Sequence, residues 1–303
     1  MPALTLPFYK LSPGGNPTIL IRENSLLASP YGPEDRAAIA RALMDPDHLG
    51  AEQVGFLDTS RSLPHMEMMG GEFCVNAIRS AALIFARLGL LPEGQTPGCR
   101  EGSVTTSGAG APIPVRVSPI PGPCAPETGL PGSMAMEAAI ALPLPKDATD
   151  SLVTECAHGE VLVRLPGITH LLLDANVHSL PDSPLDAAAA KRAAYGLDAE
   201  EAAGVIWHVP GPAKTVAITP VVRVAATGSS VVETACGSGS LAVALLMARS
   251  GGSGFILRQP SGHAITVAFA AYAASPGHLL GHMLAWISGP VRLIAEGTAN
   301  VSW

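Results

Sequence analysis

Two cysteines are notable because the segments that follow them resemble each other. The segment CVNAIRSAALIFARLG, from Cys74, aligns without a gap on CGSGSLAVALLMARSG, from Cys236, and six of the sixteen positions are identical. A free thiol titrates at about pH 8.5, and the N-terminus of a helix lowers that value towards neutrality. A thiolate and a thiol together can remove a proton from one face of a carbon and return it on the other.

Both segments predict the same local structure. Each begins with small or polar residues, continues as an apolar helix of about four turns, becomes basic at its end and stops at a glycine, Gly89 or Gly251. An extended run with alternating β-branched residues follows each helix, at 110–117 and at 262–269. The chain therefore contains a strand, helix and strand unit twice.

The rest of the chain predicts an α+β fold rather than a regular parallel one. Many short β-type runs flank the two long helices, which favours two sheets, each wrapped around a helix. One further exposed helix is expected at 185–204. Residues 118–133 are rich in proline and glycine, as is typical of an exposed connector, and we place a domain boundary there.

Composition excludes several classes of partner. The net charge of −7 and the scattered basic residues give no patch for nucleic acid or for an anionic membrane surface. The N-terminus lacks the pattern of a secretory signal, and the five cysteines include no CxxC pair, so we expect reduced thiols in the cytoplasm and no metal site. Between Arg258 and Arg292 there is no charged residue, which favours buried strands and a homodimer interface.

The two helix starts suit an amino-acid substrate. Unpaired backbone N–H groups there can hold a substrate carboxylate and stabilise the charge that spreads into it as the α-proton leaves. The small residues after each cysteine, 75–77 and 237–239, allow the close approach of a ligand to the backbone. The pair Cys74 and Cys236 thus predicts a racemase or epimerase that needs no cofactor. Cys99, Cys124 and Cys156 are assigned structural roles, the first two in loops and the third in a strand.

Four segments together resemble the diaminopimelate epimerase superfamily along nearly the whole chain. They are FYKLSPGGNPTILI from Phe8, GGEFCVNA, ETACGSGS and GPVRLIAEG. The resemblance implies two pseudo-symmetric half-barrel domains, each a β-sheet around a central helix, with an amino-acid substrate, no cofactor and no metal. It also implies that the last strand, 288–303, returns to the first domain, so we expect domains of 1–125 with 288–303, and of 126–287.

The resemblance also implies substrate contacts beside the two catalytic cysteines. The residues at matching positions are Asn16, Val75, Asn76, Glu233, Gly237 and Ser238. Asn16, Asn76, Gly237 and Ser238 would contact the amino and carboxylate groups, and Glu233 is a candidate for the ammonium group. Each of the polar residues could equally form a turn or cap a helix.

Departures from the superfamily pattern bear on the substrate. In diaminopimelate epimerases, polar residues recognise a second amino and carboxyl group, but here their places are taken by 167–170 (GITH) and by Thr227-Gly228. The GGEFC form, the GITH segment and Glu233 are more similar to the histidine racemase branch, which serves opine metallophore synthesis, so histidine is the predicted substrate.

Several alternatives remain at this point. Diaminopimelate epimerase or a proline-racemase-like enzyme would use the same fold and two cysteines. The segment ETACGSGSLAVALL also resembles the glycine-rich turn of an S-adenosylmethionine-dependent methyltransferase, although the next strand supplies no carboxylate. A non-catalytic amino-acid-binding protein would use the same duplicated fold but would not need two thiols.

Overall fold

The computed structural model describes residues 3–22, 32–120, 135–271 and 282–302. The chain divides into two compact units, Met1–Ile140 with Ser288–Trp303, and Ala141–Ile287. The division falls within two long strands, β7 (Ala135–Pro145) and β16 (His282–Ser302). The boundary expected after residue 125 and most of the expected connector lie in 121–134, outside the described residues.

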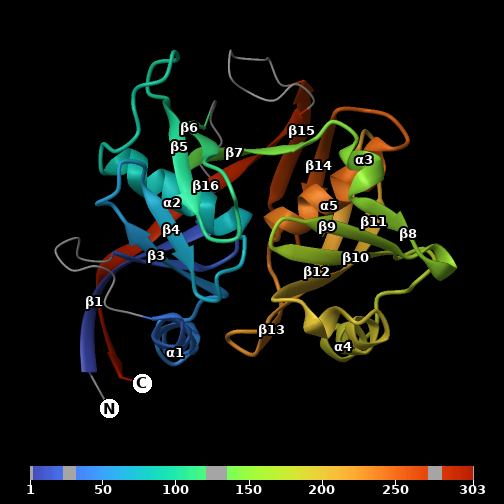
Figure 1. Ribbon diagram of the computed structural model, residues 1–303, viewed down its shortest axis with the longest axis horizontal. Coiled ribbons are helices and arrows are strands. Elements are labelled where there is room, and N and C mark those ends of the chain that lie inside the picture. Colours follow the sequence, from blue (N-terminus) through green and yellow to red (C-terminus); the bar gives the residue numbers. More distant parts are fainter. Residues whose placement is uncertain (1–2, 23–31, 121–134, 272–281, 303) are drawn as a thin grey trace. The chain divides into compact units, whose positions relative to one another are not determined.

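The first unit is a closed barrel of eight strands around one helix, which can be followed in Figure 1. Its strand order is β1-β2-β3-β4-β5-β6-β7-β16, and pairing of β1 with β16 closes the barrel. The strands that precede β7 are β1 (Ala3–Pro13), β2 (Thr18–Arg22), β3 (Gln53–Asp58), β4 (His65–Met68), β5 (Arg100–Thr106) and β6 (Ile113–Pro119). Helix α2 (Val75–Arg87) contacts all six of them.

The second unit repeats this pattern of pairing. The order continues from β16 through β15, β14, β12, β11, β10 and β9 to β8, with β13 beside β12. The strands are β8 (Val153–Glu155), β9 (Val161–Leu165), β10 (Ile168–Asp174), β11 (Ala202–Pro210), β12 (Thr215–Val224), β13 (Ser229–Val232), β14 (Gly254–Arg258) and β15 (Ala264–Ala271). They surround helix α5 (Gly237–Ala248), which contacts β9, β10, β11, β14 and β15.

The alternation of strand directions is the same in both units. In the first, β1–β2 and β3–β4 are antiparallel and β2–β3 and β4–β5 are parallel; in the second, β9–β10 and β11–β12 are antiparallel and β10–β11 and β12–β14 are parallel. A helix crosses between each first parallel pair, α1 (Pro33–Met44) or α4 (Pro184–Ala194). The predicted duplicated α+β fold is therefore confirmed.

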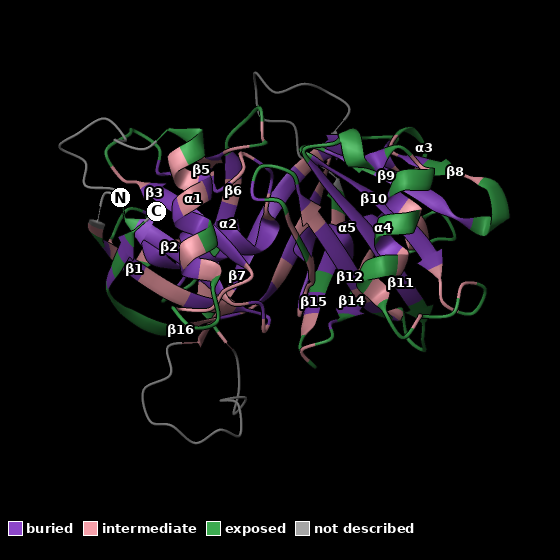
Figure 2. Ribbon diagram, turned by 90° about the horizontal axis from the view of Figure 1, so that it is seen from below, coloured by how far each residue is buried: buried purple, intermediate pink, exposed green. Residues whose placement is uncertain are grey.

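The first turns of both central helices are buried on every side because a sheet surrounds each helix. All residues of α2 from Val75 to Phe85, and all residues of α5 from Gly237 to Leu245, are buried. Figure 2 shows the contrast with α4, which lies on the outside of its sheet and is mostly exposed. Each central helix ends as predicted, before a glycine with positive φ, Gly89 (73°) or Gly251 (100°).

The outer helix of the second unit differs from its prediction. A helix was expected over 185–204, but α4 ends at Ala194 and β11 begins at Ala202. Gly196 adopts a left-handed conformation (φ 67°), which ends the helix. The short 3₁₀ helix η2 (Leu197–Ala199) follows it. The buried carboxylate of Glu160 anchors α4 through Lys191 and Tyr195.

The remaining short elements are α3 (Ala148–Ser151) and the 3₁₀ helix η1 (Ala157–Gly159). Cys156, expected within a strand, instead follows β8 directly and precedes η1. Cys99 lies in a loop as expected, and Cys124 lies outside the described residues. No helix in the described part of the chain combines the length and the apolar character needed to cross a membrane.

Candidate functional site

Cys74 and Cys236 occupy the same position in their respective units, the N-cap of the central helix. Their backbone angles are almost identical, φ −131° and ψ 107° for Cys74 and φ −130° and ψ 110° for Cys236. Each sulfur accepts a hydrogen bond from the backbone N–H three residues later, from Ala77 at 3.5 Å and from Gly239 at 3.3 Å. Both thiols therefore lie at the positive end of a helix dipole, where a thiolate is stabilised.

Tight packing around the second cysteine requires glycine at position 239. A Cβ there would lie 3.0 Å from the Cys236 sulfur and 2.5 Å from Cδ1 of Ile206. Packing is also tight next to the first cysteine, because a Cβ on Gly108 would lie 2.5 Å from the backbone nitrogen of the preceding residue, Phe73. Gly239, one of the small residues expected to allow ligand approach, therefore also makes room for the Cys236 thiol.

The polar partner of Cys74 comes from strand β3. Cys74 donates from its sulfur to Oε1 of Gln53 over 2.8 Å. The Gln53 amide nitrogen in turn donates to Oδ1 of Asn16 and to the Thr18 hydroxyl at 2.7 Å, which fixes the orientation of the amide. Asn16 is fully buried and its own amide nitrogen donates to Glu52. Asn16 therefore supports Gln53 and, through it, Cys74.

The polar partners of Cys236 come from strand β10 and from its own helix. The Ser238 hydroxyl lies 3.6 Å from the Cys236 sulfur, and Nε2 of His170 lies 3.0 Å from that hydroxyl. Burial lowers the pKa of His170 to about 3, so the ring is neutral at physiological pH. The backbone N–H of Cys236 donates to Oε1 of Gln259 over 2.9 Å.

Gln53 and His170, which support the two thiols, come from equivalent pairs of parallel strands. The larger residue lies on the second strand of the pair in the first unit and on the first strand in the second unit. In the first unit Thr18 of β2 is opposite Gln53 of β3, and in the second His170 of β10 is opposite Gly204 of β11. Each pair thus supplies one large polar group that extends towards the start of the central helix. A Cβ on Gly204 would lie 2.2 Å from Nδ1 of His170, so the imidazole fills the space that this glycine leaves.

The charges around the two thiols differ. Burial raises the pKa of Cys236 well above its ordinary value, and the charge of Glu233 and a hydrogen bond to it raise it further, whereas hydrogen bonds from Ser238 and Gly239 lower it. The guanidinium of Arg79 is charged and interacts with the Cys74 thiol. Arg79 is fully buried and donates to Oδ1 of Asn76 over 3.3 Å.

The remaining predicted contacts lie at the helix starts. Val75 and Gly237 are the first helical residues after the two cysteines and Asn76 and Ser238 are the second, and all four are buried. The predicted site residues thus fall into two groups, Asn16, Val75 and Asn76 around Cys74, and Glu233, Gly237 and Ser238 around Cys236.

Sequence reasoning missed Gln53, Arg79 and Gln259, and it assigned His170 no role in catalysis. Arg79 carried one signal, since a single arginine in an otherwise apolar helix needs a buried set of acceptors.

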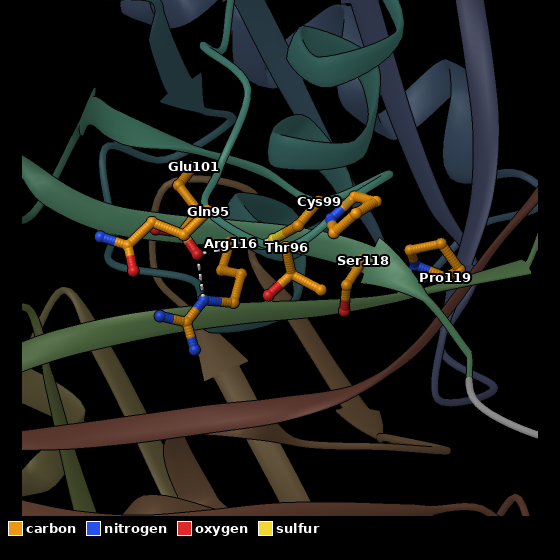
Figure 3. Close-up of a pocket in the computed structure, with 8 residues that line it drawn as sticks. Gln95, Thr96, Cys99, Glu101, Arg116, Ser118 and Pro119 are labelled. Atoms are coloured by element: carbon orange, nitrogen blue, oxygen red, sulfur yellow. Dashed lines mark hydrogen bonds and ion pairs between the residues drawn. The ribbon is translucent and has the colours of Figure 1, made fainter.

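A surface pocket of about 590 Å³ lies elsewhere in the first unit, beside strands β5 and β6 (Figure 3). Its lining is Gln95, Thr96, Pro97, Cys99, Glu101, Arg116, Ser118 and Pro119, which includes none of the predicted site residues. Arg116 and Glu101 form an ion pair of 2.8 Å across it. Burial and a hydrogen bond to Glu101 raise the pKa of the Cys99 thiol, so this cysteine lacks an activating environment.

Groups of three or more potential metal ligands are absent from the part of the chain that the structure describes. The groups around the two thiols are amides, hydroxyls, a neutral imidazole, the guanidinium of Arg79 and the carboxylate of Glu233.

Comparison with known proteins gives matches at three levels. A family model described as the histidine racemase CntK N-terminal domain matches residues 5–300. Histidine racemases of Fusobacterium nucleatum and Staphylococcus aureus are 42% and 37% identical over 81 and 79 residues. These alignments cover 27% and 25% of this chain and only 27% of the length of each relative.

Among solved structures, a hydroxyproline epimerase from Agrobacterium vitis with bound trans-4-hydroxy-L-proline superposes with a TM-score of 0.65. The superposition covers 98% of this chain and 93% of that one at 13% sequence identity, a level that supports a shared fold. Because the family model spans nearly all of the sequence, the chain belongs to the histidine racemase CntK N-terminal domain family.

Proposed function

We propose that the protein is a cofactor-independent amino-acid racemase that inverts the α-carbon with two thiols. The observation that carries this proposal is the equivalent placement of Cys74 and Cys236, each at the N-cap of the central helix of a duplicated unit. Inversion requires one group to take the proton from one face and another to supply a proton to the opposite face. Two units of the same architecture, each with one thiol at the N-cap of its central helix, can supply these two groups.

The proposed reaction conserves protons and charge. The thiolate of one cysteine takes the α-proton and becomes a thiol, while the thiol of the other cysteine gives its proton to the opposite face and becomes a thiolate. The carbanion formed in between spreads its charge into the substrate carboxylate. Backbone N–H groups of Val75, Asn76, Gly237 and Ser238, at the starts of the two helices, are the proposed donors to that carboxylate.

The substrate ammonium group is assigned to the remaining polar residues. Glu233, close to Cys236, supplies a carboxylate for it. Asn16 is the other proposed contact, and its hydrogen bonds to Glu52 and Gln53 make its role in positioning the first thiol equally important.

Histidine is the proposed substrate. The family description and the names of the bacterial relatives both refer to histidine racemase. The sequence supports the choice, because Thr227-Gly228 and residues 167–170 replace the polar residues with which diaminopimelate epimerases recognise a second amino-acid head group. We further infer that the protein works in the reducing cytoplasm, where both thiols stay free.

The experiment is a racemisation assay with L-histidine, read by chiral chromatography, on the wild type and on Cys74→Ser and Cys236→Ser. General acid and base groups contribute about 100-fold or more to rate, so each substitution should lower kcat by at least that factor. Cys99→Ser and Cys156→Ser are matched controls, because both thiols are free but neither caps a central helix, and we expect near wild-type rates. Full turnover in either Cys74→Ser or Cys236→Ser would contradict the proposal.

A further inference from the structure

Arg79 is a buried cation whose hydrogen bonds all go to neutral acceptors. Its side chain is fully buried in the first unit, and Nε donates to the backbone oxygen of Ala138 over 3.0 Å. The other two bonds run to Oδ1 of Asn76 at 3.3 Å and to the backbone oxygen of Pro290 at 3.2 Å. All three acceptors are neutral, and within the described residues no ion pair within 4.0 Å involves this guanidinium.

The charge of Arg79 persists at physiological pH. Burial lowers its pKa to about 10, and the negative charges of Glu137 and of Cys74 act in the opposite direction. A buried cation with only neutral acceptors favours a nearby anion, because the low dielectric strengthens their attraction. Glu137 of β7 and the Cys74 thiolate, which lies five residues earlier in the chain, are the two anions that act on it.

The second unit has the opposite arrangement. The gap-free alignment of the two helices places Leu241, which is fully buried, at the position of Arg79. The charged group near Cys236 is the carboxylate of Glu233, which disfavours a thiolate. Exposure acts in the same direction, because Cys236 is only 3% exposed whereas Cys74 is partly exposed.

The hydrogen bond between Cys74 and Gln53 opposes this difference in thiol ionisation. The carbonyl oxygen of Gln53 accepts a hydrogen bond from the Cys74 thiol and so stabilises the protonated form. It is a neutral dipole, and neutral hydrogen bonds are about half as strong as those that involve a full charge. The guanidinium of Arg79, by contrast, carries a full charge and favours the thiolate.

The carboxylate of Glu137 in β7 also acts on the charge of Arg79, and most other ionisable groups on the elements around the two helices have partners of their own. Around α2 these are Lys10 with the Leu49 carbonyl, His65 with Glu67, Asp58 with Arg61, Arg100 with Glu93, Arg116 with Glu101, and Glu72 with the Gly70 N–H. Around α5 they are Glu155 with Arg249, Asp174 with the Asn176 N–H, and the neutral His170, while Arg164 and Arg258 are exposed.

We propose that the buried guanidinium of Arg79 makes Cys74 the thiolate of the resting protein, while burial and the carboxylate of Glu233 keep Cys236 protonated. Arg79 is thus a positioning residue that assigns the roles of the two thiols. This assignment rests on the proposed function, and it makes Cys74 the base and Cys236 the acid when the first substrate binds. The enantiomer whose α-proton faces Cys74 then reacts without a prior exchange of protons.

The first test needs no variant. The alkylation rate of each cysteine by iodoacetamide, followed across pH by peptide mass spectrometry, gives a midpoint for ionisation of each thiol. The midpoint, unlike the rate, does not depend on how accessible the sulfur is. We expect the midpoint of Cys74 to lie at least one pH unit below that of Cys236. An equal midpoint, or a lower one for Cys236, would overturn the inference.

The second test separates charge from packing. Arg79→Leu copies the residue of the second unit, and it should raise the Cys74 midpoint by about one unit, which is about tenfold less thiolate at neutral pH. Arg79→Lys keeps the charge and should leave the midpoint near that of the wild type. Glu233→Gln is the matched control, and it should lower the midpoint of Cys236 without moving that of Cys74.

An unchanged Cys74 midpoint in Arg79→Leu, or the same shift in Arg79→Lys, would refute a role for the charge. If Arg79→Leu does not fold, the order of midpoints in the wild type and the response to Glu233→Gln still decide. These readouts report thiol ionisation and not turnover. Failure of the proposed function would instead appear as absent racemisation, whatever the order of the midpoints.

Discussion

Substitution of Gly204 tests how the second thiol is supported. A Cβ at this position would lie 2.2 Å from Nδ1 and 2.7 Å from Cε1 of His170, whereas ordinary contacts begin at 3.4 Å. In Gly204→Ala the ring must therefore move by about 1 Å or more, which breaks its 3.0 Å bond to Ser238. Loss of that bond costs about 1 kcal/mol and overpacking costs about 1–3 kcal/mol, so we expect about 2–4 kcal/mol of destabilisation.

The assay is urea denaturation at pH 7.5 of four proteins that form a double-mutant cycle: wild type, Gly204→Ala, His170→Ala and the double variant. Removal of the imidazole leaves room for the new methyl group, so Gly204→Ala should cost less than about 1 kcal/mol in the His170→Ala background. The coupling should then be about 2 kcal/mol. Equal costs of Gly204→Ala in both backgrounds would show that the imidazole is not what this glycine accommodates.

Three further predictions concern pH and packing. Burial lowers the pKa of His170 from 6.5 to about 3, so the unfolded chain takes up this proton first as the pH falls. The stability that neutral His170 contributes is therefore complete above pH 6.5 and is lost as the pH falls towards 3, a change of at most about 5 kcal/mol. The free energies of unfolding of wild type and His170→Ala are compared by urea denaturation across this pH range. A difference between them that does not change with pH would refute the prediction. Burial raises the pKa of Glu160, but its hydrogen bonds to a lysine and a tyrosine outweigh burial and lower it. Its contribution exists above the unfolded carboxyl pKa and disappears as the pH falls through the folded one, so Glu160→Gln should lower Tm at pH 7 and less so at acid pH. Gly108→Ala should cost about 1–3 kcal/mol because φ is +68° and a backbone nitrogen lies 2.5 Å from the new Cβ, whereas Gly110→Ala, in open space, should not, and equal thermal melts would contradict this.

The sequence predicts the duplication and the two reactive positions because both depend on local patterns. An apolar helix between a small-residue start and a terminal glycine can be recognised without tertiary structure, and each thiol lies at the first residue of that pattern. Two copies of it in one chain then indicate a repeated unit, and the strand pairings of the two units agree with that prediction.

The supporting groups could not be predicted in the same way because they come from distant strands. Gln53 lies 21 residues before the thiol that it contacts, and His170 lies 68 residues before Ser238. Their roles depend on parallel strand registers that place one bulky and one small residue opposite each other. The predicted helix at 185–204 was too long for a different reason, since Gly196 was not recognised as its end.

The most direct test of the proposed two-thiol mechanism is the fate of the α-hydrogen during racemisation of L-histidine in deuterated water. With two separate proton-transfer groups, the D-histidine formed at low conversion should carry deuterium at the α-carbon, while the remaining L-histidine should keep its protium. Product that retains the original protium, or a failure of the wild type to form D-histidine at all, would contradict the assignment of Cys74 and Cys236 as the two groups.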